Sequence, residues 1–283
     1  MGLPLRSAPT RLLDDRDLPA VTELLSRNPI ADVFVASRVA ACGLDPWRLG
    51  AEVWGHTVDG SLAALCYSGA NLWPVAAGPD SARLFAERAR RQGRRCSSIV
   101  GVGSAVSAMW RYLEPTWGPA REIRGEQPLL AIDAPPRIAP DNSVRLVRPD
   151  ELDVLLPACI AMFTEEIGVS PVGPDGGALY RSRVAEFVGQ RRSFARIEHG
   201  QVLFKAEIGA VAGDVCQIQG VWVAPALRGR GLGAAGTASV VALARAMFAP
   251  IVSLYVNDFN HSARRAYERV GFERVGTFAS ILF

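Results

Sequence analysis

Residues 215–236 read VCQIQGVWVAPALRGRGLGAAG, and this stretch decides the fold of the second half of the chain. Residues 215–223 alternate in hydrophobicity and are rich in residues that favour β-structure, which predicts a strand. Ala224-Pro225 ends that strand, because proline has no N–H to donate to a ladder. The glycine-rich segment that follows, residues 228–233, opens a helix that we expect to run to about Phe248.

The glycine-rich loop between this strand and this helix has the composition of an anion site. Glycines leave backbone N–H groups uncovered, and a helix N-terminus carries partial positive charge. Arg228 and Arg230 add positive potential beside these groups. The segment therefore predicts a site for a pyrophosphate.

Other nucleotide motifs fit the loop less well. A P-loop needs Lys-Ser or Lys-Thr after its last glycine, whereas Ala234 follows Gly233 here. Residues 231–236 satisfy the dinucleotide pattern G-x-G-x-x-G, but that motif follows directly on the first strand of a parallel unit. Here seven residues separate Val223 from Gly231, and the preceding strands are expected to be antiparallel. An NAD-dependent oxidoreductase is therefore a less favoured alternative, as is a glycine turn without a ligand.

A second motif follows at residues 253–272, SLYVNDFNHSARRAYERVGF. Together with Arg228-x-x-Gly231-x-Gly233, it resembles the GNAT (GCN5-related N-acetyltransferase) superfamily. The family's strand and helix carry Asn-x-x-Ala-x-x-x-Tyr-x-x-x-Gly-Phe, and the matching residues are Asn260, Ala263, Tyr267, Gly271 and Phe272. The resemblance implies an N-acetyltransferase that moves an acetyl group from acetyl-CoA, as co-substrate, to a primary amine. An acyl-CoA-binding sensor without catalysis is the main alternative.

The resemblance also implies which residues contact acetyl-CoA. The end of the strand would bind the pantetheine amides through backbone groups, and the loop and first helical turn would bind the pyrophosphate. Asn260 would contact the cofactor from the next helix, although asparagine also suits a helix N-cap. The remaining residues of this set are Val221, Trp222, Val223, Arg228, Gly229, Arg230, Gly231, Leu232, Gly233 and Ala234.

Tyr267 is the candidate general acid, because a phenol near the thioester can donate a proton or a hydrogen bond to the departing thiolate. A core tyrosine is the alternative. Some protein-acetylating members of the family carry a glutamate base at the position of Gln217, which cannot accept a proton. The remaining candidates for the base are Glu207, Glu165 and Glu166, each of which could instead be a solvated charge.

The order of elements predicts a tandem repeat of one α+β domain, each copy a twisted, mostly antiparallel sheet flanked by helices. Helices are expected at about 15–27, 30–42, 149–166 and 176–191, with hairpins that turn at Asp59-Gly60 and His199-Gly200. The proline-rich stretch 129–144 is the expected boundary, with little in it that could pack. The predicted domains are residues 1–135, a degenerate GNAT-like copy without the glycine loop, and residues 143–283, the catalytic copy. Such two-part arrangements recur among actinobacterial acetyltransferases.

Composition excludes several classes of protein. The 283 residues are 49% hydrophobic and 21% charged, which fits globular domains rather than a disordered chain. A net charge of +3 disfavours nucleic acid as a partner. The five cysteines form no zinc pattern, so no metal is expected, and reduced thiols favour the cytoplasm. No membrane span or signal peptide is expected. We expect a monomer or a weak homodimer.

Overall fold

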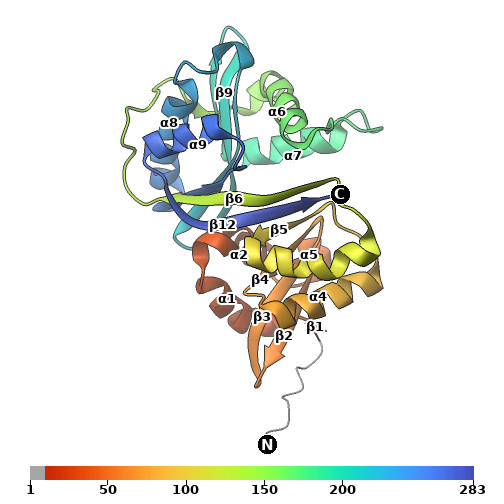
Figure 1. Cartoon of the computed structure of the whole chain (residues 1–283). Helices are drawn as coiled ribbons and strands as arrows, with labels where there is room; N and C mark the ends of the chain where they lie inside the picture. The colour runs from red at the N-terminus through yellow and green to blue at the C-terminus, as the bar shows by residue number, and fades with distance from the viewer. Residues whose placement is uncertain (1–9) are drawn as a thin grey trace, which may run out of the picture. The chain divides into compact units, whose positions relative to one another are not determined.

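The protein is described by a computed structural model that covers residues 10–283. The chain forms two compact units (Figure 1). Unit 1 contains the residues up to Leu129 together with Tyr255–Asp258 and Arg274–Phe283. Unit 2 contains Leu130–Leu254 and Phe259–Glu273. No helix of residues 10–283 combines the length and the apolar character that a membrane crossing requires.

Unit 1 is built on strands in the order β1-β2-β3-β4-β5-β12-β6. Its β2–β3 hairpin turns at Asp59-Gly60, where both residues have positive φ, as expected for a two-residue hairpin loop. Its elements are β1 (Arg11–Leu12), a 3-10 turn (Asp15–Asp17), α1 (Leu18–Ser26), α2 (Pro29–Cys42), α3 (Pro46–Leu49), β2 (Glu52–Val58), β3 (Ser61–Ser68), β4 (Asn71–Val75), α4 (Pro79–Gln92), β5 (Ser98–Val102), α5 (Gly103–Trp117), β6 (Glu122–Ile132) and β12 (Glu273–Leu282).

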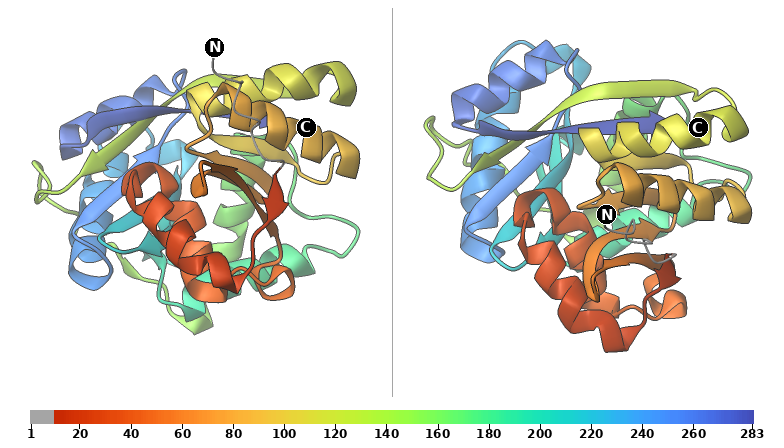
Figure 2. Two further views of the ribbon diagram at one scale, coloured as in Figure 1. Left: turned by 90° about the horizontal axis from the view of Figure 1, so that it is seen from below. Right: turned by 60° about the horizontal axis from the view of Figure 1, so that its bottom comes forward.

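Side chains that alternate along these strands cover the two faces of the unit 1 sheet. Val53 and Leu65 face α1 and α2, whereas the neighbouring Trp54 and Cys66 face α4 and α5. Figure 2 shows the two helix pairs on opposite sides of the strands. Two separate hydrophobic cores result, one on each face.

Unit 2 has strands in the order β11-β10-β9-β8-β7, with α6 and α7 on one face and α8 and α9 on the other. The β8–β9 hairpin turns at His199-Gly200, as predicted. The elements are β7 (Arg145–Leu146), a 3-10 turn (Pro149–Glu151), α6 (Leu152–Ile167), α7 (Ala178–Gly189), β8 (Ser193–Glu198), β9 (Gln201–Ala212), β10 (Val215–Val223), a 3-10 turn (Pro225–Leu227), α8 (Leu232–Met247), β11 (Ile251–Tyr255) and α9 (His261–Val270).

The predicted fold class is confirmed: each unit is a mostly antiparallel sheet with helices on both faces. The strand at 215–223 and the helix that follows it also lie where the sequence places them. One expectation for the boundary is wrong, because Leu129–Ile132 are buried as the end of β6. These four apolar residues belong to a run of consecutive buried positions at the end of a strand that begins before the proline-rich stretch.

The last strand of the sequence, β12, does not join the sheet of unit 2 that precedes it in the chain. β12 pairs antiparallel with β5, from Phe278 opposite Val102 to Leu282 opposite Ser98, and so completes the sheet of unit 1. The division into residues 1–135 and 143–283 is contiguous, whereas the compact unit 1 takes in residues 274–283.

Candidate functional site

The last part of β10 has one edge that β11 does not use. The parallel pairing of these strands runs from Val215 opposite Ile251 to Gln217 opposite Ser253. Beyond it, β10 continues to Val223 in register with β9, interrupted by two bulges. Backbone groups of the segment that contains Val221, Trp222 and Val223 can therefore bind an extended ligand, as an unpaired strand edge does.

A glycine-built helix N-terminus follows this strand. Gly229 and Gly231 have φ of 74° and 86°, a region that other residues rarely adopt. Gly231 is the N-cap of α8, and no side chain caps the helix. The first intrahelical bond between the loop and the helix joins the Ala235 N–H to the Gly231 carbonyl. The earlier N–H groups, those of Leu232, Gly233 and Ala234, have no intrahelical acceptor and remain available to an anion.

Arg228 and Arg230 both lie on this loop and are exposed. The Arg228 guanidinium donates from Nε to the Val223 carbonyl at 3.0 Å and forms an ion pair of 2.7 Å with Glu165. Trp222 Nε1 donates to the same carboxylate at 3.2 Å. Glu165, near the end of α6, thus connects that helix to the glycine loop. Nothing in the local sequence pattern signalled this connection, because the partners are far apart in the chain.

The face of β9 and β10 that packs against α6 holds a buried ion pair. Lys205 Nζ lies 2.6 Å from Glu207 Oε1, and only 1% of the lysine side chain is exposed. Burial has the largest single effect and disfavours the charged lysine, but the charge and hydrogen bond of Glu207, with smaller effects of Cys159 and Tyr180, together outweigh it and raise the pKa of Lys205. The pair lies under the bulge at Gly220, where an added Cβ would meet Lys205 Nζ at 3.2 Å. The i, i+2 spacing of the two residues on one strand was the available signal for this pair, which sequence reasoning missed.

Tyr267 lies on α9 with 7% of its surface exposed, and its ring meets Phe272 edge-on at 5.9 Å. Burial, and then the negative charge of Glu166, raise the pKa of Tyr267 well above its usual range. Glu166 is exposed at the end of α6, and this effect places it within electrostatic range of the phenol. Of the three candidate carboxylates, Glu166 is the one whose charge contributes to the raised pKa of Tyr267.

Asn260 occupies the N-cap of α9, where its side-chain oxygen accepts a hydrogen bond of 3.1 Å from the Ala263 N–H. The capping role is therefore present. A contact with a cofactor stays a prediction.

Unit 1 has a different junction at the corresponding place. There β4 leads to α4 through Ala76-Ala77-Gly78, and Gly78 has an ordinary φ of −73°. Pro79 at the first helical position has no N–H to offer. Ser81, in the first turn, is hydrogen-bonded to buried His56 at 2.8 Å. The glycine-rich loop of unit 2, residues 228–233, therefore has no counterpart in this junction of unit 1.

Two segments of the chain match known protein families. Residues 181–272 match the acetyltransferase (GNAT) family, and residues 51–155 match a domain of unknown function, DUF4081. No curated protein matches the chain. The chain therefore carries a GNAT acetyltransferase domain in its C-terminal half, as its motifs predicted, and a DUF4081 domain before it. The family assignment supports acyl transfer as the class of reaction.

Solved structures share the fold over nearly the whole chain. A GCN5-related N-acetyltransferase from Sphaerobacter thermophilus has a TM-score of 0.60 at 18% identity and covers 99% of this chain and 97% of its own. A tandem GNAT protein from the clavulanic acid biosynthesis pathway has a TM-score of 0.57 at 14% identity, with 96% and 98% covered. A GCN5-related N-acetyltransferase from Kribbella flavida has a TM-score of 0.54 at 16% identity, and the match covers 90% of this chain and 94% of that protein. These likenesses concern the fold alone.

Proposed function

We propose that unit 2 transfers an acetyl group from acetyl-CoA to a primary amine of a small molecule or a peptide. The observation that carries the proposal is the uncapped N-terminus of α8, reached through positive-φ glycines at 229 and 231. Free N–H groups at a helix N-terminus bind phosphate groups. Beside them, the unused edge of β10 offers backbone partners to the pantetheine amides. The match to the GNAT family supports an acyl-CoA as the ligand with these two parts.

Tyr267 would stabilise the departing sulfur. Its raised pKa keeps the phenol protonated at neutral pH, so that it can donate a hydrogen bond as the C–S bond breaks. A thiol has a pKa of about 8.5, below that of an ordinary phenol at about 10. Complete transfer of the phenol proton to the thiolate is therefore uphill, and hydrogen-bond donation is the favoured role.

Glu166 is the favoured base among the three candidate carboxylates. An amine attacks the thioester carbonyl only when it is neutral, so a carboxylate or a water next to it must accept the proton. Pairing does not distinguish the three carboxylates, because Glu165 is bound to Arg228 and Trp222, Glu207 is bound to Lys205, and Glu166 also has an interaction within the described residues. Glu166 is exposed and is electrostatically coupled to Tyr267. This coupling supports an arrangement in which the acid and the base act on the same thioester.

One observation favours the alternative of an acyl-CoA-binding protein without turnover. Gln217 is 7% exposed and its Nε2 is buried without a hydrogen-bond partner among the described residues. An amide at this position cannot accept a proton from an amine. The two functions share the same binding site and differ in whether free CoA is released when amines are added.

Thermal unfolding in the presence of acetyl-CoA tests the proposal, because a ligand that binds only the native state raises Tm. We expect acetyl-CoA to raise Tm of the unaltered protein, and Gly233→Glu to abolish the increase by placing a negative charge among the phosphate-binding N–H groups. A glutamate in the first turn of a helix suits its dipole, so the fold should survive. Gly78→Glu, at the N-cap of α4, is the control in unit 1, and it should leave the increase intact.

The same experiment separates the alternatives. An increase with NAD but not with acetyl-CoA would contradict the family-based proposal. Calorimetric titration should give a stoichiometry of about one acetyl-CoA per chain, because unit 1 has no glycine-rich loop before a helix N-terminus. A subsequent screen of amines for release of free CoA distinguishes the enzyme from the sensor.

A further inference from the structure

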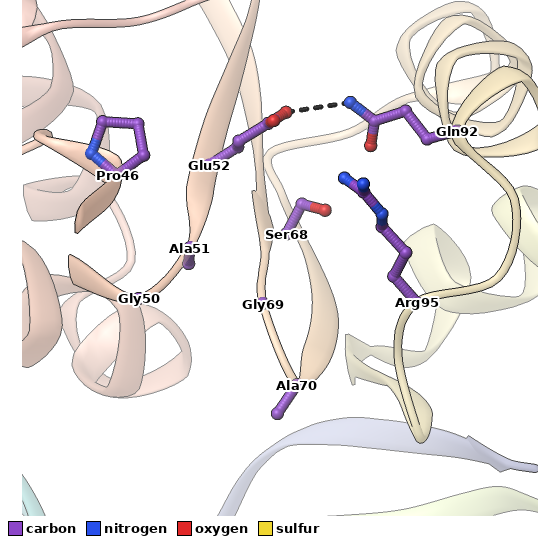
Figure 3. A pocket seen from close by; sticks show the side chains of 9 residues that line it. All are labelled: Pro46, Gly50, Ala51, Glu52, Ser68, Gly69, Ala70, Gln92 and Arg95. Atoms are coloured by element: carbon purple, nitrogen blue, oxygen red, sulfur yellow. Dashed lines mark hydrogen bonds between the residues drawn. The ribbon is translucent and has the colours of Figure 1, made fainter.

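A polar cavity lies in unit 1. Its volume is about 320 Å³, near the lower end of the range for small-molecule sites. Its polar side chains come from the start of β2, the end of β3, the end of α4 and the loop after α4, and Pro46 of α3 also lines it (Figure 3). Those with polar groups are Glu52, Ser68, Gln92 and Arg95.

Strand register explains why these groups converge. Glu52 lies directly opposite Ser68 in the antiparallel β2–β3 pair, so both side chains project from the same face of the sheet. Trp54, two residues along β2, projects from that face too and is buried against α4. The C-terminus of α4 therefore places Gln92 over Glu52, and the loop that follows brings Arg95 to the same place.

Only one oxygen of the Glu52 carboxylate, Oε2, has partners within the described residues. Its Oε2 accepts hydrogen bonds from Trp54 Nε1 at 2.6 Å and from Gln92 Nε2 at 3.0 Å, and Arg88 lies 3.8 Å away. Burial raises its pKa, but these hydrogen bonds and the charges of Arg88 and Arg95 outweigh burial, so the pKa of Glu52 is lowered. Glu52 is therefore an ionised carboxylate, and its hydrogen bonds and its ion pair within residues 10–283 all use Oε2 and leave Oε1 open. A ligand N–H can bind there.

Arg95 supplies the complementary group. Its guanidinium extends toward Ser68 and Gln92 in Figure 3. No hydrogen bond or ion pair engages it within the part of the chain that the structure describes. Glu52, Arg88 and Arg95 together leave one surplus positive charge, which a ligand carboxylate would neutralise. Guanidinium groups bind carboxylates with paired, charge-assisted hydrogen bonds.

We propose that this cavity, which we call the Glu52–Arg95 site, binds a free α-amino acid. The ligand carboxylate lies on Arg95, and its ammonium group donates to Glu52. An inorganic anion meets repulsion from Glu52, and a simple amine leaves Arg95 without a partner. The volume admits a side chain beyond the amino-acid backbone, with Ser68 and Gln92 as further polar contacts.

Calorimetric titration of the full-length protein with each proteinogenic α-amino acid tests this site. We expect at least one amino acid to bind with a dissociation constant in the millimolar range or lower. Its 2-hydroxy acid analogue, without the ammonium group, and its decarboxylated amine should each bind at least about tenfold more weakly. Equal binding of the amine and the amino acid, or no binding by any amino acid, would overturn the proposal.

Two variants locate the binding. Arg95→Ala removes no hydrogen bond or ion pair within residues 10–283, and it should weaken binding at least about tenfold. Glu52→Gln keeps the shape and removes the charge, with a similar expected loss. Arg91→Ala, which removes an exposed arginine from the last turn of α4, is the matched control and should change affinity by no more than about twofold. Binding that is the same in Arg95→Ala and Arg91→Ala would place the ligand elsewhere and refute the site.

Discussion

Tyr267 illustrates how burial sets the role of a single side chain. Its ring packs against Phe272 and its pKa is raised, so the hydroxyl is a hydrogen-bond donor throughout the neutral range. Removing that hydroxyl leaves the packing of the ring in place. The catalytic contribution of Tyr267 can therefore be separated from its contribution to stability.

Tyr267→Phe should lower kcat at least about tenfold and leave the affinity for acetyl-CoA within a few-fold. The reason is that the hydroxyl acts on charge that develops only in the transition state. Steady-state kinetics with an acceptor from the amine screen, together with calorimetry, make the measurement. An unchanged kcat, with chemistry shown to be rate-limiting, would assign Tyr267 to packing.

Asp32 is a second residue whose environment alters its chemistry. It lies in the first turn of α2 with 4% of its surface exposed, and burial raises its pKa to about 7. The unfolded chain has the ordinary aspartate pKa of about 3.9. The folded state therefore binds the proton more tightly, and the stability linked to it is present below about pH 4 and is lost as pH rises through about 7.

Asp32→Asn should therefore become more stable than the unaltered protein as pH rises. The difference in the free energy of unfolding should be small near pH 4 and reach up to about 4 kcal/mol above pH 7. Urea unfolding at several pH values provides the measurement. Asp80→Asn, an exposed aspartate in the first turn of α4, is the control and should show no such trend. A pH-independent difference would mean that Asp32 is ionised in the folded state.

At the scale of elements, α8 approaches β9 closely because Gly236 has no side chain. A Cβ added at Gly236 would lie 2.7 Å from three atoms of the Phe204 ring, and both residues are buried. This close contact fixes the direction of α8 as it leaves the glycine loop. The position of the phosphate-binding N–H groups therefore depends on a residue outside the loop.

Gly236→Ala should destabilise the protein by about 1–3 kcal/mol, because the added methyl group overpacks the interface with Phe204. The same substitution at Gly189, the last residue of α7, meets nothing within 4 Å and should be neutral or slightly stabilising. Urea unfolding compares the two variants. Equal stability of both would show that α8 can move away from β9 at little cost.

At the scale of the whole molecule, the last residues of the chain complete the sheet of unit 1. Phe278 on β12 is fully buried there, with its ring edge-on to Trp73 at 5.6 Å and tilted against Tyr255 at 5.2 Å. The stability of unit 1 therefore depends on residues that follow the entire acetyltransferase motif in sequence.

Phe278→Ala should destabilise unit 1 by about 3–5 kcal/mol, since it leaves a cavity between the strands and α2. Hydrogen exchange should rise in β4 and β5 more than in β8 and β9. Val275→Ala, at an exposed position of the same strand, is the matched control and should stay within about 0.5 kcal/mol. A rise confined to β8 and β9 would contradict the assignment of β12 to unit 1.

The sequence by itself determined the features that depend on neighbouring residues. Asp59-Gly60 and His199-Gly200 define hairpin turns through their tolerance of positive φ, and the alternation of 215–223 defines a strand. The glycines after Pro225 define the start of α8 and the exposed N–H groups there. Local backbone preference is enough in each case, because the deciding interactions span only a few residues.

Tertiary structure decided which distant residues meet. The pairing of β12 with β5, the ion pair of Glu165 with Arg228, and the convergence of Glu52 and Arg95 all join segments separated by many residues. No local preference selects such partners, because several strands of similar hydrophobicity compete for each edge. The pairing that forms is the one that buries the most apolar surface in the folded chain as a whole.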